Sequence, residues 1–267
     1  MHTNRLARII PKTKYRGIKM FETLKTNLVQ AYKRMYESHS YLSPDEVYIS
    51  LRSGDGNYFA VSSKSRYVKD VSEIIILNSE CKIVEGSKSD FDTLFFSHYL
   101  IYKAYPFIHC IVNSDSKWLS VWAGTGLALP PVTQLHTRHF FGEIACVKKI
   151  PDVSDTEVFS IKIAKEILST LKQKFVYQTP AIFIHTIGAF VWGKNSKCAL
   201  DTLINLEEIA ERTYLLGLTK RETFTYISYE YSLANYMSST ESISPDSQIH
   251  RLDLNEQWIK NCHDMLK

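Results

Sequence analysis

Three observations predict an α/β domain of the α+β-like kind, a single three-layer domain with a central mixed, largely antiparallel sheet flanked by helices. Short apolar segments with strand character come in clusters separated by turn signals, and amphipathic helical segments lie between the clusters. The 267 residues, 45% of them apolar, suffice for one full hydrophobic core. No G-x-G-x-x-G or P-loop motif occurs, which disfavours a doubly wound parallel sheet.

In the N-terminal half, apolar spacing predicts an amphipathic helix over 20–39 and a second helix over 92–105. Asp92 or Thr93 can cap the second helix, and Pro106 stops it. The segment 53–57, Ser-Gly-Asp-Gly-Asn, has the composition of a hairpin turn. The strands expected in this half are Val47–Leu51, Tyr58–Ser62, Ile74–Leu77 and Ile108–Asn113.

In the C-terminal half, the clearest helix is 156–174, where acids come early and lysines late, as the helix dipole favours. The serine-rich stretch 238–247 is typical of a surface loop. The other expected helices are Trp118–Gly124, Ser196–Leu218 and Asn255–Met265, and the expected strands are Glu143–Val147, Ala181–Gly188 and Val191–Gly193.

The charge of the chain is concentrated at its start. Residues 1–19 hold six of the 32 basic residues and none of the 28 acidic ones, so residues 20–267 carry 26 basic against 28 acidic residues, a balance of −2. Because residues 20–267 have no excess of basic residues, they lack the basic surface expected of a nucleic-acid-binding protein. We therefore expect a basic flexible N-terminal extension over 1–19, a folded domain over 20–267, and no nucleic-acid partner.

The expected location is cytoplasmic. No apolar run reaches the roughly 18 residues of a membrane span, and no signal-peptide core follows the start, so no membrane partner is expected. The five cysteines are odd in number and form no C-x-x-C pair, which favours free thiols in a reducing compartment. The arginine-rich start leaves an organelle transit peptide or an upstream start codon as alternatives for residues 1–19.

Several motifs make the sequence resemble the class II aldolase and adducin family, and within it the L-ribulose-5-phosphate 4-epimerases. The most specific are Gly-Ala-Phe-Val-Trp-Gly-Lys-Asn at 188–195 and Phe-Phe-Gly-Glu-Ile-Ala-Cys at 140–146. The run Ile-Val-Asn-Ser-Asp-Ser at 111–116, Leu-Pro-Pro at 129–131 and Leu-Glu-Glu-Ile-Ala at 206–210 also match in spacing. The resemblance covers about 20–217.

The resemblance implies a class II aldolase-like fold, a homotetramer, and active sites at subunit interfaces. Family members use a divalent metal, commonly zinc, held by three histidines, and the metal polarises an oxygen of a sugar phosphate as a Lewis acid. A neutral imidazole suits zinc because it offers a nitrogen lone pair in a tetrahedral arrangement.

The three ligand positions of the family fall on Asn113, Asp115 and Ile187 in this sequence. Ile187 has no lone pair, and Asn113 offers only a neutral carbonyl oxygen, so we expect a degenerate site, no metal and no cofactor. The alternative is a displaced zinc or other divalent-metal site made by His136, His185 and Asp115, since His185 precedes Ile187 by two residues and would share its strand face.

The other roles implied by the resemblance change as well. The acid/base aspartate falls on Arg138, which cannot act as a general base. An acidic residue at the start of the second helix is retained as Asp92, although a role as helix N-cap would explain it equally well. The second acid/base residue that the resemblance implies, a tyrosine near the C-terminus from a neighbouring subunit, has no match. The phosphate-binding turn corresponds loosely to Ser62, Lys64 and Ser65 but lacks its glycine. The catalytic candidates are thus Asp92, His136, Arg138 and His185.

The favoured hypothesis is a divergent family member that has lost its metal site. It binds an anionic sugar-derived or carboxylate molecule, as a pseudoenzyme or as a metal-independent enzyme, and cationic side chains favour such an anion. The alternatives are an interaction module like the adducin head and a metal-dependent epimerase or aldolase with displaced ligands. A homotetramer or a mixed oligomer with a sister subunit is expected. The ligand-binding candidates are Ser62, Lys64, Ser65, Asn113, Asp115, Arg138 and His185.

The remaining histidines have no partner constellation in the sequence. A histidine without such partners is more often a satisfied core residue or a surface residue than a ligand. This interpretation covers His98, His109, His139, His250 and His263.

Overall fold

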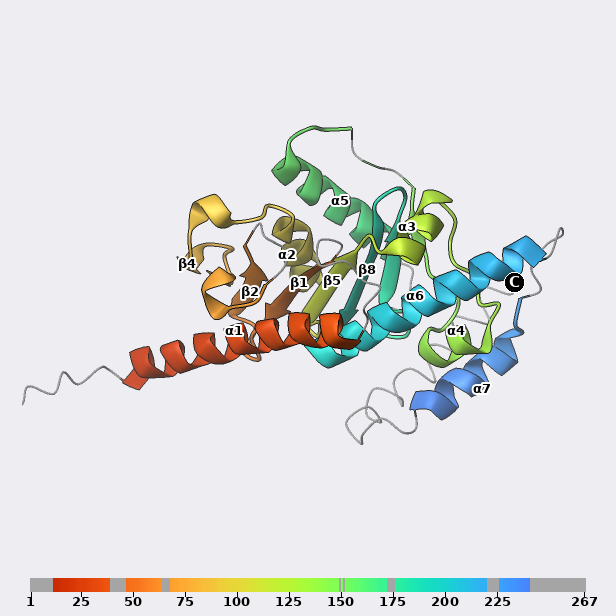
Figure 1. Cartoon of the computed structure of the whole chain (residues 1–267), viewed down its shortest axis with the longest axis horizontal. Helices are drawn as coiled ribbons and strands as arrows, with labels where there is room; N and C mark the ends of the chain where they lie inside the picture. The colour runs from red at the N-terminus through yellow and green to blue at the C-terminus, as the bar shows by residue number, and fades with distance from the viewer. Residues whose placement is uncertain are drawn as a thin grey trace, which may run out of the picture.

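The computed structural model describes residues 12–38, 47–63, 68–148, 150, 152–171, 176–219 and 226–240, with 12–18 and 240 as backbone only. Within these ranges one eight-stranded sheet has helices on both faces (Figure 1). The predicted fold class is confirmed. The strands are β1 (Val47–Arg52), β2 (Tyr58–Ser62), β3 (Ile74–Asn78), β4 (Ile83–Glu85), β5 (Cys110–Ser114), β6 (Cys146–Val147), β7 (Ala181–Ile184) and β8 (Gly188–Gly193).

The strand order is β4-β3-β2-β1-β5-β8-β7-β6. Every pair is antiparallel except β6 with β7, which is parallel, so the sheet is mixed and largely antiparallel as predicted. β5 lies at the centre, between β1 and β8, and is buried along its whole length. Strands buried on both faces are almost continuously apolar, which explains the run Cys-Ile-Val at 110–112.

Two hydrophobic clusters fill the spaces on the two faces of the sheet. One contains residues of α1, α3 and α6, and the other contains residues of α2 and α5 (Figure 1). Alternate residues of β5 belong to different clusters: Val112 points to the first and Ile111 to the second, as the two-residue period of a strand requires. The helices are α1 (Lys12–Ser38), α2 (Phe95–Ala104), α3 (Lys117–Gly124), α4 (Gln134–His139), α5 (Thr156–Leu171), α6 (Ser196–Thr219) and α7 (Tyr229–Thr240).

The first helix begins earlier than predicted. α1 starts at Lys12, not at Met20, so residues 12–19 form its first turns, while residues 1–11 lie outside the described part. Between Pro11 and Met20 the sequence contains no proline, and a single glycine does not stop a helix. Composition alone therefore placed the start of the helix too late.

The segment 181–188, predicted as one buried strand, is a hairpin. β7 ends at Ile184 and β8 begins at Gly188. The Ile187 N–H donates to the Ile184 carbonyl, and Thr186 has a left-handed φ of 64°. The positive φ of Gly188, 134°, continues this turn, and such backbone angles end a strand.

Other differences are smaller. The helix expected over 92–105 begins at Phe95, and the strand expected over 143–147 is reduced to Cys146–Val147. The helices α4 and α7 and strand β4 were not predicted, and α7 extends into the stretch taken for a loop. The helix predicted over 255–265 lies outside the described residues.

The length and apolar character of the helices bear on membrane insertion. Within the residues that the structure covers, none combines the length and the apolar character needed to cross a bilayer.

Candidate functional site

The three positions that correspond to family metal ligands lie where β5 ends and the β7–β8 hairpin turns. Ser114 pairs with Ala189, and a Cβ placed on Gly188 would come within 2.2 Å of the Ser114 carbonyl oxygen and 3.0 Å of the Asp115 Cα. Only glycine permits this approach. We call Asn113, Asp115, Ile187 and Gly188 the strand-end corner.

The side chains of the strand-end corner do not fit a zinc ion. Asn113 is 9% exposed, Asp115 is exposed, and Ile187 packs against the hydrophobic cluster under α2 and α5. Zinc needs three or four lone-pair donors, and Ile187 provides only hydrocarbon. Among the described residues, no group of three or more His, Cys, Asp or Glu side chains is placed to hold a metal ion.

A buried carboxylate holds the backbone that follows Asn113. Glu207 of α6, 2% exposed, accepts hydrogen bonds from the Ser116 hydroxyl at 2.7 Å and from the N–H groups of Trp118 at 2.9 Å and Leu119 at 3.1 Å. These N–H groups begin α3 and have no acceptor within their helix. Glu207 therefore caps α3 from a distant element and fixes the chain on which Asp115 lies.

A second set of buried polar side chains, Ser50, His98 and Tyr102, lies near Asn113 on the α2 face of the sheet. The Ser50 hydroxyl oxygen is 2.7 Å from His98 Nδ1 and 2.9 Å from the Tyr102 hydroxyl, and Tyr102 donates to the Ser50 carbonyl at 2.9 Å. Burial lowers the pKa of His98 to about 3, and the Asn113 side chain offsets part of this effect. His98 is thus neutral at neutral pH.

His136 does not reach the strand-end corner through any contact of the described residues. It is fully buried in α4, and its Nε2 lies 2.7 Å from the Gly142 carbonyl oxygen. A carbonyl only accepts, so Nε2 carries the proton. Burial lowers the pKa of His136 to about 4, the state of a neutral core histidine.

His185 and Arg138 are separated as well. The displaced-ligand alternative assumed that His185 and Ile187 share a strand face. Because 185–187 is a turn, they do not. The His185 ring lies 3.3 Å from the point where a Cβ on Gly126, after α3, would lie. Arg138 is exposed on α4, which lies on the opposite side of α6 from α3 in Figure 1. One subunit therefore does not bring these candidates together.

The phosphate-site candidates lie at and after the end of β2. Ser62 is fully buried, and its hydroxyl accepts a hydrogen bond of 3.2 Å from Tyr32, so it belongs to the core and not to a ligand surface. Lys64 and Ser65 lie outside the described residues. The neighbouring Ser63 pairs with Phe91 in an isolated bridge, which brings the end of β2 beside the chain leading to Asp92.

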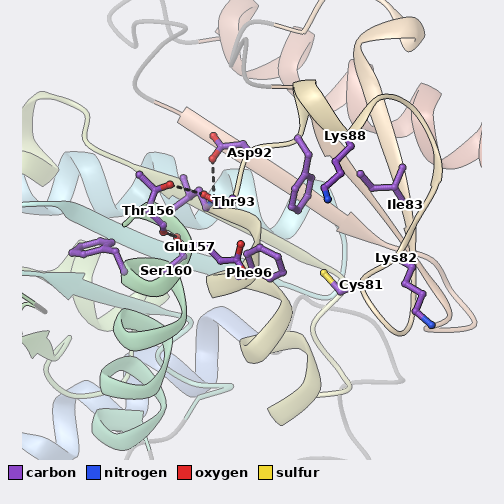
Figure 2. A pocket seen from close by; sticks show the side chains of 13 residues that line it. Cys81, Lys82, Ile83, Lys88, Asp92, Thr93, Phe96, Thr156, Glu157 and Ser160 are labelled. Carbon is purple, nitrogen blue, oxygen red and sulfur yellow. Dashed lines mark hydrogen bonds between the residues drawn. The ribbon is translucent and has the colours of Figure 1, made fainter. Parts of the chain in front are cut away.

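Asp92 lines a separate cavity of about 890 Å³ between the starts of α2 and α5, which we call the α2–α5 pocket. Asp92 accepts from the Leu94 N–H at 2.9 Å and so makes the capping turn before α2. Figure 2 shows Thr93 bonded to Thr156, at 3.0 Å, with Lys82, Ile83 and Lys88 on the opposite side of the pocket. The remaining lining is mainly aromatic and aliphatic: Phe91, Leu94, Phe96 and Phe159.

Among the described residues, the cysteine that lines this pocket is Cys81. Burial and the nearby Glu157 raise its pKa to about 11. The side chain stays a thiol at neutral pH and is not an activated nucleophile.

The fold and the strand-end corner have counterparts in a known protein family. The model of the class II aldolase and adducin N-terminal domain matches residues 26–214. The chain belongs to this family. Of the curated proteins, L-ribulose-5-phosphate 4-epimerase UlaF of Salmonella paratyphi C is 27% identical over 146 residues, which are 54% of this chain and 63% of that protein. The match therefore leaves more than a third of that relative uncovered.

Solved structures of the family have the same fold. L-fuculose 1-phosphate aldolase of Glaciozyma antarctica PI12 gives a TM-score of 0.62 at 19% identity, covering 86% of this chain and 84% of its own. An aldolase II superfamily protein of Pseudomonas syringae gives 0.66 at 13% identity, covering 95% and 96%. At such identities the likeness shows the fold and not the activity.

Sequence reasoning missed the two residues that support the strand-end corner. His98 was taken for a histidine without partners, although it is four residues before Tyr102 on the buried face of α2. Glu207 was considered only as part of the family motif Leu-Glu-Glu-Ile-Ala at 206–210. An acidic residue amid the apolar positions of α6 was the available signal.

Proposed function

We propose that this chain is a divergent class II aldolase-family protein that does not use the three-histidine zinc chemistry and binds a sugar-derived or carboxylate molecule instead. The observation that carries the proposal is Ile187 at the third ligand position, where it packs against a hydrophobic cluster beside Gly188. A hydrocarbon side chain there removes a ligand and occupies its place.

Polar groups near the strand-end corner support a ligand-binding role. Asn113 and Asp115 keep a donor, an acceptor and a charge at the end of a buried strand. The separate α2–α5 pocket has a volume of the size that small ligands fill, with Lys82 and Lys88 on its rim for an anionic group. Whether a reaction follows binding separates a pseudoenzyme from a metal-independent enzyme.

A second candidate function is an interaction module, in the manner of the adducin head. Large apolar side chains are exposed on the last turns of α6 and around the start of α7, and such patches mark protein contacts. This surface also supports the proposal of a homo-oligomer, tetrameric as the family resemblance implies, or of a mixed oligomer with a sister subunit. The exposed residues are Tyr214, Leu215, Leu216, Leu218, Tyr226, Tyr229 and Tyr231.

The decisive experiment measures the metal content of the protein produced with zinc and dialysed against a mild chelator. We expect far less than one zinc per chain. The triple variant Asn113→His, Asp115→His, Ile187→His restores the family ligands and should retain zinc, while the matched triple alanine variant should not. Stoichiometric zinc in the unmodified protein, with turnover of L-ribulose 5-phosphate that His185→Ala abolishes, would establish the displaced metal site and overturn the proposal.

A further inference from the structure

The start of α6 lies directly against the end of β8, at Gly193. The Asn195 side chain accepts from the Cys198 N–H at 2.8 Å and so caps the helix, which places Cys198 in its first turn. A Cβ built on Gly193 would lie 2.7 Å from the Ala199 nitrogen and 2.9 Å from the Cys198 Cβ. Cys198 therefore lies in the space that a side chain at position 193 would fill.

The cross-strand neighbour of that space is Cys110. In the sheet, Cys110 of β5 pairs with Gly193 of β8. Side chains directly opposite each other in such a pair point to the same face, with Cβ atoms about 4.5–5.5 Å apart. Cys110 is fully buried in the hydrophobic cluster of α1, α3 and α6, so it points to the face on which α6 lies. Cys110 and Cys198 are thus neighbours in space, one on the strand and one on the helix.

The electrostatic interaction between the two cysteines supports this placement. Burial raises the pKa of the Cys110 thiol, and the nearby Cys198 raises it further. A disulfide needs Cβ atoms about 3.5–4.5 Å apart, which is close to the separation of cross-strand neighbours. A small adjustment of the first turn of α6 is therefore enough to bring the two sulfurs to bonding distance.

The two thiols differ in their access to solvent. Cys198 is half-buried, whereas Cys110 has no exposed surface. A thiol that solvent cannot reach does not react with a dissolved oxidant. Oxidation therefore starts at Cys198, and Cys110 is placed to react second.

We propose that Cys198 and Cys110 form a redox-active pair that reacts with a hydroperoxide and closes to a disulfide between α6 and β5. The Cys198 sulfur attacks the peroxide, and an S–O bond forms as the O–O bond breaks. The displaced oxygen takes up the thiol proton and leaves as water or an alcohol. The Cys110 sulfur then attacks the Cys198 sulfur, an S–S bond forms as the S–O bond breaks, and the Cys110 proton leaves with the hydroxide as water. The two sulfurs together lose two electrons, which reduce the peroxide.

The disulfide ties together two elements that support the strand-end corner. β5 carries Asn113, and α6 carries Glu207, the carboxylate that caps α3. The packing of α6 on the sheet then depends on the redox state of the pair, and a thiol reductant reverses the change. This inference is independent of the proposed function, because neither cysteine belongs to the strand-end corner or to the α2–α5 pocket.

The first test maps the bond in the full chain. The reduced, folded protein is treated with an equimolar amount of hydrogen peroxide, free thiols are blocked, and peptides are identified by mass spectrometry. We expect the Cys110–Cys198 cross-linked peptide as the main product, and we expect dithiothreitol to remove it. In urea the preference for this pair should disappear, because the fold brings the two cysteines together. Another main pairing in the folded protein, including one with Cys262, or no intramolecular disulfide, overturns the proposal.

The second test establishes which cysteine reacts first. In Cys110→Ala the sulfenic acid on Cys198 cannot close to a disulfide, so dimedone, which traps sulfenic acids, should label Cys198 about tenfold more than in the parent protein. In Cys198→Ala, Cys110 should stay a free thiol. The matched control is Cys146→Ala, which removes a half-buried cysteine of β6 and should leave the Cys110–Cys198 bond unchanged. Urea unfolding curves show which variants are folded. Oxidation of Cys110 in a folded Cys198→Ala variant at the rate of the parent protein overturns the proposed order.

The third test measures the effect of the bond on α6. The amides of Cys198 and Ala199 both hydrogen-bond to Asn195, and their hydrogen exchange reports the opening of the first turn. Oxidation should slow this exchange by about fivefold in the parent protein, since the bond holds the turn on β5. Peroxide should not slow the exchange of Ala199 in Cys198→Ala. Equal exchange in the oxidised and reduced parent protein overturns the link between the redox state and the packing of α6.

Discussion

The strand-end corner and the α2–α5 pocket are built differently. At the strand-end corner, two pieces of backbone touch at Gly188, and buried polar groups, Glu207 and His98, support them from two different helices. The pocket encloses about 890 Å³, and its polar residues Lys82, Lys88 and Glu157 are exposed on its rim. The strand-end corner has fixed groups with little space, and the pocket has space with few fixed groups.

This difference indicates how the two regions can contribute to function. Specific recognition needs polar groups whose positions are held by neighbours, because only such groups lose little freedom on binding. The strand-end corner meets that condition, and the pocket provides volume and apolar contact. Substitutions should therefore be costly at the strand-end corner and mild at the pocket.

The largest effect is expected for Gly188→Ala. The added Cβ would lie 2.2 Å from the Ser114 oxygen, at a φ of 134°, and should lower the free energy of unfolding by about 4 kcal/mol. Two matched variants separate the causes in urea unfolding. Gly142→Ala has a φ of 75° but open space and should cost about 1 kcal/mol, and Gly54→Ala, with neither problem, should change little. Equal costs at 188 and 142 would show that the close contact is unimportant.

The second largest effect is expected for Glu207→Ala, which leaves three hydrogen-bond donors at the start of α3 without their acceptor. We expect a loss of about 3 kcal/mol in the free energy of unfolding. The neighbouring Glu208→Ala is the control, since it removes only a half-exposed pair with Arg212 on the same helix and should cost about 0.5 kcal/mol or less. A small effect of Glu207→Ala would mean that water replaces the carboxylate.

Acid should destabilise the protein through its buried histidines. The pKa of His98 is lowered to about 3 and that of His136 to about 4, against 6.5 when unfolded. Below pH 6.5 these histidines bind protons in the unfolded chain but not in the folded chain. The free energy of unfolding is therefore highest above that pH and falls as the pH drops towards 4. Each histidine should contribute about 1 kcal/mol per pH unit.

Urea unfolding between pH 7 and pH 4 measures this slope. Carboxylates also titrate in acid, so the contribution of His98 is the difference between the parent protein and a folded His98→Gln variant. An unchanged slope in that variant would contradict the assignment of His98 as a neutral buried group.

The smallest effect is expected at the pocket. Thr93→Val removes the hydrogen bond to Thr156 that joins the starts of α2 and α5, and should lower the free energy of unfolding by about 0.5 kcal/mol. Thr93→Ser keeps the hydroxyl and is the matched control. A loss as large as that of Glu207→Ala would show the pocket to be as rigidly built as the strand-end corner.

Local patterns were sufficient for most of the fold. The hairpin turn at 53–57 and the strand Tyr58–Ser62 follow from composition and alternation, and both are present. The β7–β8 hairpin was missed because its turn contains Thr186 and Ile187, which carry no turn signal, and a left-handed backbone is rare for a β-branched residue such as Thr186. Helix α4 is shorter than two turns and has no clear period.

The family motifs placed Asn113, Asp115 and Ile187 at one corner, but the motifs could not supply its supporting residues. Glu207 and His98 act across the sheet and between helices, and no spacing along one element encodes such contacts. Alternation could not show that the hydroxyl of Ser62, a ligand-binding candidate, bonds to Tyr32 in the core.

The contacts of Glu207 also bear on how the protein is made. They join residues 88 to 91 positions apart in the chain. During synthesis, α3 must leave the ribosome long before its capping carboxylate exists, and β5 likewise emerges well before its partner strand β8. Contacts of such separation form slowly and late. The strand-end corner should therefore be among the last parts of the nascent chain to become ordered, after α6 has emerged.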